Sequence, residues 1–221
     1  MSFPIYIATE LTKKSGNKMV IDKLSFEIYE NEFVYLKGAN GTGKTTLLNI
    51  IAKLDNLWSG ELKFKGISLK KIKLHNYPIS YIPDAPIFYE GLTVKEHLNF
   101  ISSMYGLKDE EAREIVNIYV SVFNLKEYLN YLPSQLSRGN KQKVMLCCGL
   151  LKDFEVLIAD EPFNFLDSAS VKALFEILSI LKSSGKTIIL TSHEVEYVKG
   201  LIDREIELKR SVEKSVKVAF S

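Results

Sequence analysis

The chain has 221 residues, of which 46% are hydrophobic and 25% are charged, and its formal net charge is +2. This length fits one large domain, or one domain with an inserted lobe, of ordinary globular composition. The charge is too small to indicate nucleic-acid binding by itself. No apolar stretch approaches the ~20 residues needed to cross a bilayer, and the N-terminus lacks the pattern of a secretory signal. We therefore expect a cytosolic protein.

Short runs of β-type composition recur along the chain, and helical patterns separate the later runs. The expected strands are 25–28, 33–36, 61–64, 79–82, 156–159 and 187–191. The expected helices are 44–54, 110–123, 142–151 and 168–183. The last two strands are apolar throughout, as is typical of parallel strands buried on both faces. With the helix between them they form a strand–helix–strand unit.

The first third and the middle of the chain differ from this pattern. Short strands follow each other closely near the N-terminus, which favours a small antiparallel layer. The stretch from about 93 to 132 is nearly all helical in pattern and lies between a strand and a polar loop, which indicates an inserted helical lobe. We predict one α/β domain over 1–221, with a parallel core sheet, an N-terminal antiparallel lobe and a helical lobe at about 93–135.

The two cysteines, Cys147 and Cys148, are neighbours inside a helical pattern. Adjacent helical positions do not face one another, and the spacing is not that of a CxxC motif. Buried thiols in a reducing compartment are therefore expected.

A glycine-rich loop follows the strand at 33–36 and precedes a helix. The segment 38–45 reads GANGTGKT and matches the phosphate-loop pattern GxxxxGK[ST]. Glycines let the backbone N–H groups curl around phosphate oxygens, while Lys44 reaches the β- and γ-phosphates and the Thr45 hydroxyl ligates Mg²⁺. The predicted nucleotide-binding residues are Gly38, Asn40, Gly41, Gly43, Lys44, Thr45 and Thr46.

Two carboxylates and a histidine follow the apolar strands at 156–159 and 187–191. Asp160 is placed to hold the Mg²⁺ shell, and Glu161 can accept a proton from an attacking water. His193 follows the next strand in the chain, and its position predicts contact with the γ-phosphate and with that water. A histidine metal site is not expected, because His75 and His97 share no ligand spacing with His193.

In order and spacing, these motifs resemble those of the ATP-binding cassette (ABC) transporter ATPases. The resemblance covers about 11–208 and includes LSRGN at 136–140 as the family signature, VLIADE at 156–161 and NFLD ending at Asp167. It implies a phosphate-loop NTPase fold and an ATPase that uses ATP and Mg²⁺. The stretch PDAPIFYEGLTVKEHL resembles that of exporter-like members.

The resemblance also gives a role to the helix that begins near Ser137. In this family two chains pack head to tail around two ATP molecules, and the signature helix points its N-terminus at the nucleotide of the partner. Ser137, Arg138, Gly139 and Asn140 would therefore act on the ATP of the partner, and Asp167 would lie at the dimer interface. The helix macrodipole adds roughly 0.3–1 kcal/mol of attraction for an anion.

Four positions depart from the usual family pattern. Ser15 stands at or near the place of an aromatic residue that stacks on adenine, and base stacking is worth roughly 1–3 kcal/mol in nucleic-acid sites. Tyr6 has the wrong spacing to replace it. Asp84 replaces a glutamine and can still ligate metal. Arg138 and Asn140 replace a glycine and a glutamine, whereas Gly139 is kept.

We therefore predict an ATPase subunit that powers transport through a separate transmembrane permease subunit, at the cytoplasmic face of the membrane. It forms a homodimer or a heterodimer with another ABC ATPase, and no nucleic-acid partner is expected. The helical lobe is the expected docking surface, flanked by Phe88, Tyr89 and Tyr105, for which core packing is the alternative. The alternative functions are a soluble ABC ATPase that acts on nucleic acid or ribosomes, and a non-hydrolysing nucleotide-gated module.

Overall fold

The structure is a computed structural model that describes residues 3–210. These residues form two compact units. The first unit contains residues 3–30, 36–77 and 205–210, and the second contains 31–35 and 78–204.

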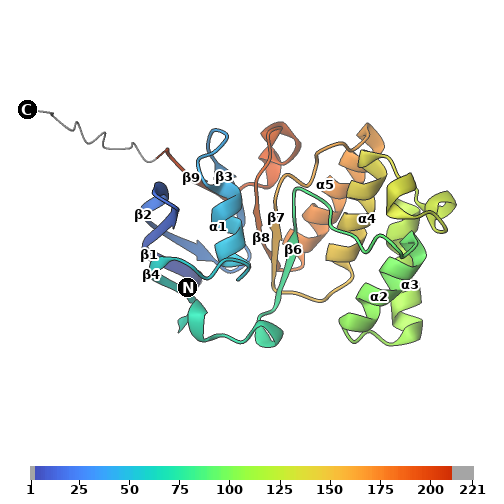
Figure 1. The fold of residues 1–221 in the computed structure, drawn as a ribbon, viewed down its shortest axis with the longest axis horizontal. Coiled ribbons are helices and arrows are strands. Elements are labelled where there is room, and N and C mark those ends of the chain that lie inside the picture. Colours follow the sequence, from blue (N-terminus) through green and yellow to red (C-terminus); the bar gives the residue numbers. More distant parts are fainter. Residues whose placement is uncertain (1–2, 211–221) are drawn as a thin grey trace, which may run out of the picture. The chain divides into compact units, whose positions relative to one another are not determined.

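The first unit is built on an antiparallel sheet of four strands in the order β2-β1-β4-β5, of which β2, β1 and β4 are labelled in Figure 1. The strands are β1 (Pro4–Ser15), β2 (Lys18–Tyr29), β4 (Ser59–Phe64) and β5 (Ile67–Ser68). Gly16, with a φ of +57°, makes the turn between β1 and β2, a conformation that favours glycine. The predicted N-terminal antiparallel layer is therefore present.

Strand β1 was not among the predicted strands, although it is one of the two inner strands of this sheet. It pairs with β2 on one side and β4 on the other, and the register shifts between Ala8 and Leu11 on the β2 side. Such bulges break the alternation of apolar and polar residues along a strand. The irregular pairing explains why the sequence pattern missed this strand.

Buried aromatic side chains connect this sheet to the end of α1 (Lys44–Ile51). The Tyr77 hydroxyl donates to the carbonyl O of Ile51 at 2.8 Å and lies 2.5 Å from the Tyr6 hydroxyl. Since Tyr77 donates its one proton to Ile51, Tyr6 donates to Tyr77. Phe64 contacts both tyrosine rings. This hydroxyl chain satisfies the last carbonyl of α1 inside the core.

The second sheet has five strands in the order β6-β7-β8-β3-β9. The strands are β3 (Phe33–Lys37), β6 (Ile79–Ile82), β7 (Val156–Ala159), β8 (Thr187–Leu190) and β9 (Arg204–Glu207). The β6/β7, β7/β8 and β8/β3 pairs are parallel. β7 and β8 are buried at every position, as their uninterrupted apolar sequences predicted.

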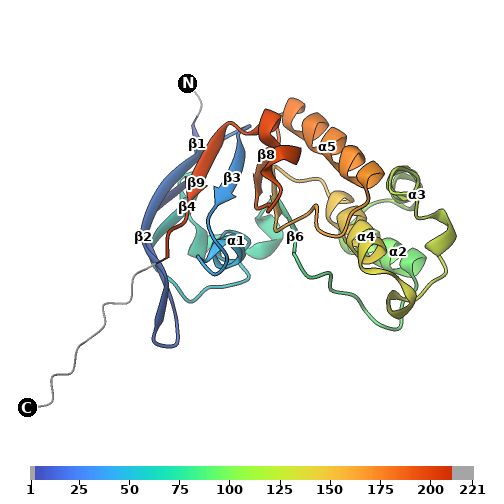
Figure 2. The same ribbon diagram turned by 90° about the horizontal axis from the view of Figure 1, so that it is seen from above.

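Four helices belong to the second unit, and α4 and α5 contact its strands. They are α2 (Val94–Met104), α3 (Asp109–Val122), α4 (Arg138–Leu150) and α5 (Ser168–Ser183). α4 contacts β6 as well as α2 and α3, so it lies between the strands and the other two helices (Figures 1 and 2). Cys147 and Cys148 on α4 are free and buried, as predicted, and burial raises the pKa of Cys148 to about 12. In the described part of the chain, no helix is long and apolar enough to cross a bilayer.

The predicted α/β class is confirmed, and the predicted helix at 168–183 agrees with α5 residue for residue. Helix α4 begins four residues earlier than its predicted start at 142, because Ser137 caps it. Helix α2 was predicted only as part of the helical lobe, and it begins with a capping box between Thr93 and Glu96.

The hydroxyl chain in the first unit yields a stability prediction. Tyr77→Phe leaves the Ile51 carbonyl and the Tyr6 hydroxyl without this partner, so we expect a loss of about 1–3 kcal/mol in the free energy of unfolding. Tyr6→Phe removes only the outer hydroxyl and should cost less. Urea unfolding of both variants at neutral pH measures the two losses. Equal losses would contradict the proposed order of donors.

Candidate functional site

The predicted site residues fall into two groups, one in each unit. The phosphate-loop residues from Gly38 to Thr46 belong to the first unit, and all the other predicted residues belong to the second unit.

The phosphate loop is held in a conformation that requires glycine at two positions. A Cβ at Gly38 would lie 2.5 Å from Thr42 Oγ1 and 2.7 Å from the Leu208 carbonyl O. Gly43 has a φ of +97°, stands at the N-cap of α1, and packs against Val20. The loop therefore passes close to its neighbours and then turns directly into a helix, which leaves the first N–H groups of α1 free for an anion.

Lys44 folds back onto the loop that precedes it. Its Nζ donates to the carbonyl O of Gly38 at 2.7 Å and to that of Ala39 at 3.4 Å. The Thr42 hydroxyl also donates to the Ala39 carbonyl, at 2.9 Å. Thr45 and Thr46 lie in the first turn of α1. The loop, the ammonium group and the start of the helix thus present positive charge and N–H donors together, as a phosphate site requires.

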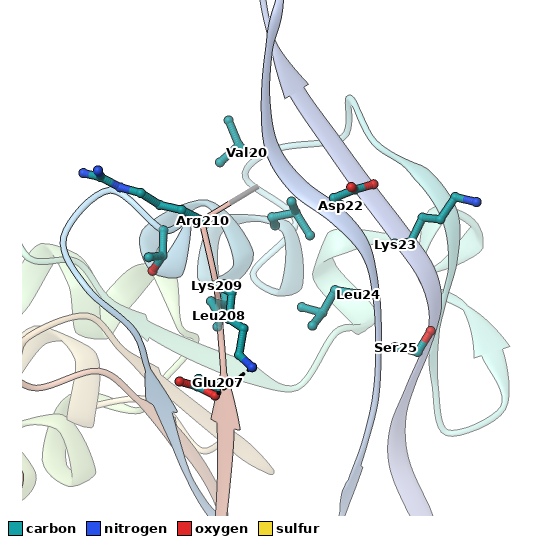
Figure 3. Close-up of a pocket in the computed structure, with 11 residues that line it drawn as sticks. Val20, Asp22, Lys23, Leu24, Ser25, Glu207, Leu208, Lys209 and Arg210 are labelled. Carbon is teal, nitrogen blue, oxygen red and sulfur yellow. Dashed lines mark ion pairs between the residues drawn. The ribbon is translucent and has the colours of Figure 1, made fainter. Parts of the chain in front are cut away.

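A cavity of about 400 Å³ adjoins this loop in the first unit. Its walls are residues 20–25 of β2, Thr42 of the loop, and residues 207–210 at the end of β9 (Figure 3). This volume falls within the range of about 300–1,000 Å³ that is typical of small-molecule sites. Arg210 Nη2 also donates to the carbonyl O of Asn40 at 3.5 Å, so a cation from the end of β9 reaches the phosphate loop.

The two residues considered for adenine stacking have different surroundings. Ser15 is exposed at the end of β1. Tyr6 is completely buried and its hydroxyl bonds to Tyr77, so its ring cannot stack on a base. The mismatch in spacing that argued against Tyr6 agrees with this placement.

In the second unit, Asp160 and Glu161 follow the end of β7, as predicted, and both are buried. Asp160 is 2% exposed, and its Oδ1 accepts a hydrogen bond from Thr191 Oγ1 at 2.6 Å. Its Oδ2 is buried and has no hydrogen-bond partner among the described residues. A buried, unpaired carboxylate oxygen is costly unless a donor or a cation completes it.

Glu161 and His193 contact each other through both backbone and side chain. The His193 N–H donates to Glu161 Oε2 at 2.8 Å, and His193 Nε2 lies 3.5 Å from Glu161 Oε1. Glu161 has a φ of +48°, a conformation that an L-residue with a side chain adopts only when its surroundings enforce it. The Glu161 side chain is 8% exposed and that of His193 is 57% exposed. The structure therefore brings the predicted base and the predicted γ-phosphate contact together.

Asp84 lies in the loop after β6 and is joined to the turn that contains Glu161. Its Oδ1 accepts a hydrogen bond from Asn164 Nδ2 at 2.9 Å. Burial, and then the charges of Asp160 and Asp84, raise the pKa of Tyr81 on β6. Asp84 is exposed and thus remains open to solvent and to ligands.

The signature segment forms the N-terminus of α4. Ser137 is the N-cap, and its hydroxyl accepts the Asn140 N–H at 3.2 Å. A Cβ at Gly139 would lie 2.6 Å from the Phe165 carbonyl O, so this glycine is needed for a close approach within the chain itself. Gln142 Nε2 donates to the Pro162 carbonyl O at 3.2 Å. Helix α4 is therefore packed directly against the turn that follows Glu161.

Arg138 and Phe165 form an exposed pair at the same place. The Arg138 guanidinium carbon lies 5.6 Å from the centre of the Phe165 ring, which is a cation–π distance. Phe165 is 57% exposed and has a φ of +63°. An aromatic residue in the left-handed region is costly, so its neighbours must fix it there.

Asp167 caps α5 and binds a lysine of the signature helix. Its Oδ1 accepts the Ser170 N–H at 2.8 Å, and its Oδ2 accepts from Lys143 Nζ at 2.6 Å. These two bonds, the one from Lys143 first, lower the pKa of Asp167 to about 2. The Lys143 side chain is only 10% exposed, whereas that of Asp167 is 56% exposed.

Besides Lys143, the sequence analysis missed four residues that contact the predicted ones. Thr191 bonds to Asp160 and Glu161, Asn164 to Asp84, and Arg210 to Asn40. Phe165 contacts the signature segment. Only Thr191 had a usable signal, because it is a polar residue at the end of an apolar strand next to the predicted histidine. The other three are recognised only from the folded chain.

The fold and these two groups of residues define a nucleotide-binding protein of the phosphate-loop class. The family described as ABC transporter matches residues 21–164. An uncharacterised ABC transporter ATP-binding protein of Methanocaldococcus jannaschii, MJ1023, is 35% identical over 200 residues, which cover 90% of this chain and 72% of that protein. EcsA of Bacillus subtilis, an ABC-type transporter ATP-binding protein, is 31% identical over 83% of this chain and 75% of its own length.

Solved structures agree with these relatives. One described as the ATP-binding subunit of an ABC transporter has a TM-score of 0.84 and 30% identity, and the match covers 93% of this chain and 86% of that one. A dimeric ATP-binding cassette in a post-hydrolysis state, bound to ADP and Pi, has a TM-score of 0.81 and 25% identity, over 93% of this chain and 94% of that one. The chain belongs to the ABC transporter family, and the predictions of the family, of its α/β fold and of an ATP-binding ATPase are confirmed.

The Lys143–Asp167 pair yields a prediction of pH-dependent stability. The pKa of Asp167 is lowered to about 2 from 3.8, so its contribution is complete above about pH 4 and is lost as the pH falls through 2. Asp167→Asn keeps a good N-cap but removes the charge. Because the carboxylate is more than half exposed, we expect a loss of only about 1 kcal/mol at pH 7, which should shrink between pH 4 and pH 2.

Urea unfolding at pH 7, 4, 3 and 2.5 measures this difference. Asp153→Asn is the matched control, because Asp153 is also paired with a lysine, Lys186, but its side chain is 95% exposed. A constant difference between wild type and Asp167→Asn across the whole pH range would contradict the assignment.

Proposed function

We propose that this chain is the ATPase subunit of a transporter whose membrane-spanning part is a separate polypeptide. In this function the phosphate loop binds the phosphates of ATP, and the Asp160–Glu161–His193 group acts on Mg²⁺ and on the attacking water. The observation that carries the proposal is the buried Asp160–Glu161 pair beside His193 in a chain that also holds an intact phosphate loop.

The residues present fit Mg²⁺ as well as ATP. Asp160 has a buried Oδ2 without a hydrogen-bond partner among the described residues, and Thr45 supplies a hydroxyl at the start of α1. Within 3–210 no three His, Cys, Asp or Glu side chains gather as a metal cluster. Most ligands would then be water and phosphate oxygens, which is the usual coordination of Mg²⁺. When bound, Mg²⁺ would neutralise charge that develops on the phosphate oxygens. Asp84 is a further candidate ligand, because its carboxylate is exposed and lies in the loop after β6.

Hydrolysis needs a base that is held in place next to a water molecule. The Glu161 carboxylate is fixed by the His193 N–H and is buried, so it is suited to accept a proton. The exposed His193 ring is free to contact the γ-phosphate and to orient the water. Lys44 holds the phosphates as the charge moves during phosphoryl transfer. This preorganised base argues against a non-hydrolysing module.

We further propose that the active form is a head-to-tail dimer, either of two copies or with another ABC ATPase. Ser137, Arg138, Gly139 and Asn140 would act on the nucleotide of the partner, with Asp167 at the interface. Exposure of Ser137, Arg138 and Asp167 supports this role. The dimeric cassette with ADP and Pi that this chain resembles also supports it.

The membrane partner would dock on the helical lobe, which we place at about 93–135, at the cytoplasmic face of the membrane. Tyr89 is exposed and packs edge-on against Phe100, while Met104 and Tyr105 are exposed on or beside the same helix, α2. Phe88 instead packs against the core and against His97. The apolar surface that supports docking therefore excludes Phe88.

The first test of this function is Glu161→Gln. The amide still accepts the His193 N–H but takes no proton from water, so we expect the Mg²⁺-dependent ATPase rate to fall by about 10²- to 10⁴-fold. The variant should still bind ATP and should elute as a dimer in gel filtration with ATP. Turnover at the wild-type rate would contradict the assignment of Glu161 as the base.

The second test addresses the head-to-tail arrangement. Lys44→Ala disables the phosphate loop, and Ser137→Asp keeps an N-cap but places a negative charge against the phosphate of the partner. We expect each variant to be inactive alone. Mixed in equal amounts, they should regain about a quarter of the wild-type sites, because half of randomly formed dimers pair the two variants and each such pair has one intact site. No recovery, with mixed dimers shown to form, would contradict the head-to-tail dimer of two copies.

A further inference from the structure

The hydroxyl of Thr191 lies between the two acidic residues and contacts both. Thr191 follows the last residue of β8 and is 0% exposed. Its Oγ1 donates to Asp160 Oδ1 at 2.6 Å and accepts the Glu161 N–H at 2.9 Å. A hydroxyl has one proton and two lone pairs, and the amide can only donate. The direction of both bonds is therefore fixed.

The parallel pairing of β7 with β8 puts Thr191 in this position. The paired residues run from Val156 and Thr187 to Ala159 and Leu190. The Thr191 N–H then donates to the Ala159 carbonyl O at 3.1 Å, which extends the ladder by one residue. Asp160 and Thr191 thus occupy the next pair of positions, and a shift of one residue would turn the side chain of Thr191 to the other face.

The Thr191 hydroxyl determines which oxygen of Asp160 is available. Oδ1 is occupied by the short bond from the hydroxyl, whereas Oδ2 is buried and has no hydrogen-bond partner among the described residues. A cation that binds this carboxylate would therefore meet Oδ2 in an orientation set by Thr191. Groups that orient a metal-binding carboxylate in this way commonly change metal affinity by about 10- to 100-fold.

The same hydroxyl also holds the backbone turn at Glu161. Glu161 has a φ of +48°, and its N–H is satisfied by Thr191 Oγ1. Without the Thr191 hydroxyl, the Glu161 N–H would lose this acceptor, and the strained turn would lose a hydrogen bond that stabilises it. One atom therefore fixes the orientation of Asp160 and the backbone from which the Glu161 carboxylate projects.

We propose that Thr191 is a positioning residue of the ATPase, which sets Asp160 for coordination of Mg²⁺ through Oδ2 and maintains the turn that presents Glu161. The inference rests on the proposed function, in which Asp160 holds Mg²⁺ and Glu161 is the base. If Thr191 only satisfied buried polar groups, its hydroxyl would affect the stability of the fold but not the requirement for Mg²⁺.

The test compares three substitutions at this position. Thr191→Val is isosteric and lacks the hydroxyl, Thr191→Ala lacks it with less bulk, and Thr191→Ser retains it. Each protein is unfolded thermally with adenylyl imidodiphosphate, a non-hydrolysable ATP analogue, in EDTA and then in increasing Mg²⁺. The half-maximal Mg²⁺ concentration for the additional stabilisation is the readout, and it is independent of turnover and of the stability of the unliganded variant.

We expect Thr191→Val and Thr191→Ala to need about 10- to 100-fold more Mg²⁺ than wild type, and Thr191→Ser to resemble wild type. The stabilisation by the analogue in EDTA should be unchanged, because Lys44 and the loop are intact. With ATP, kcat of the Val and Ala variants should fall more than KM rises.

An unchanged or lower half-maximal Mg²⁺ concentration in Thr191→Val or Thr191→Ala would overturn the inference about Thr191 but not the proposed function. An increase in Thr191→Ser as large as that in the Val and Ala variants would have the same meaning. The absence of any stabilisation of the wild type by the analogue or by Mg²⁺ would instead overturn the proposed function, and the inference with it.

Discussion

The site depends on the parallel register between β7 and β8. Both strands are apolar and buried on both faces, so their pairing is fixed by the core on each side. The polar residues after them then meet without any further adjustment, Asp160 with Thr191 and Glu161 with the backbone of His193. The pairing of the buried strands thus sets the relative positions of Asp160, Glu161 and Thr191, which are polar residues that are costly to bury.

A second constraint is the packing of α4 against the turn that runs from Glu161 to Asp167. Both Glu161 and Phe165 have positive φ values, so this turn contains two strained residues separated by three others. The helix holds it through the close approach of Gly139 to the Phe165 carbonyl, the bond from Gln142, and the Lys143–Asp167 pair. The strain at the proposed base is therefore maintained by the helix that carries the signature.

The site residues that the sequence predicted from a motif are mostly those with local interactions. Gly38, Gly43 and Lys44 lie within a few residues of one another, and their conformations follow from one strand, one loop and one helix. Thr191 and Asn164 instead act on residues far away in the chain, at 31 and 80 positions respectively. Strand register brings Thr191 to Asp160, and turn geometry brings Asn164 to Asp84. Neither the register nor the turn geometry can be predicted from a single sequence. Strand β1 was missed for a related reason, since its bulged pairing on both sides hides the alternation of a strand.

The turn from Glu161 to Asp167 contains the proposed base and contacts both the Asp84 loop and the signature helix. Its Asn164 holds Asp84, which lies in the loop that leads to the exposed apolar residues beside α2. The Phe165 ring of the turn makes a cation–π contact with Arg138, and Asp167 forms an ion pair with Lys143. Both partners lie on the signature helix. The first residue of the turn is the proposed base. Glu161 and Phe165 both have positive φ, a conformation that persists only where the surroundings enforce it, so these contacts support the strained turn. The turn that carries the proposed base is therefore held from two sides, by the Asp84 loop and by the signature helix.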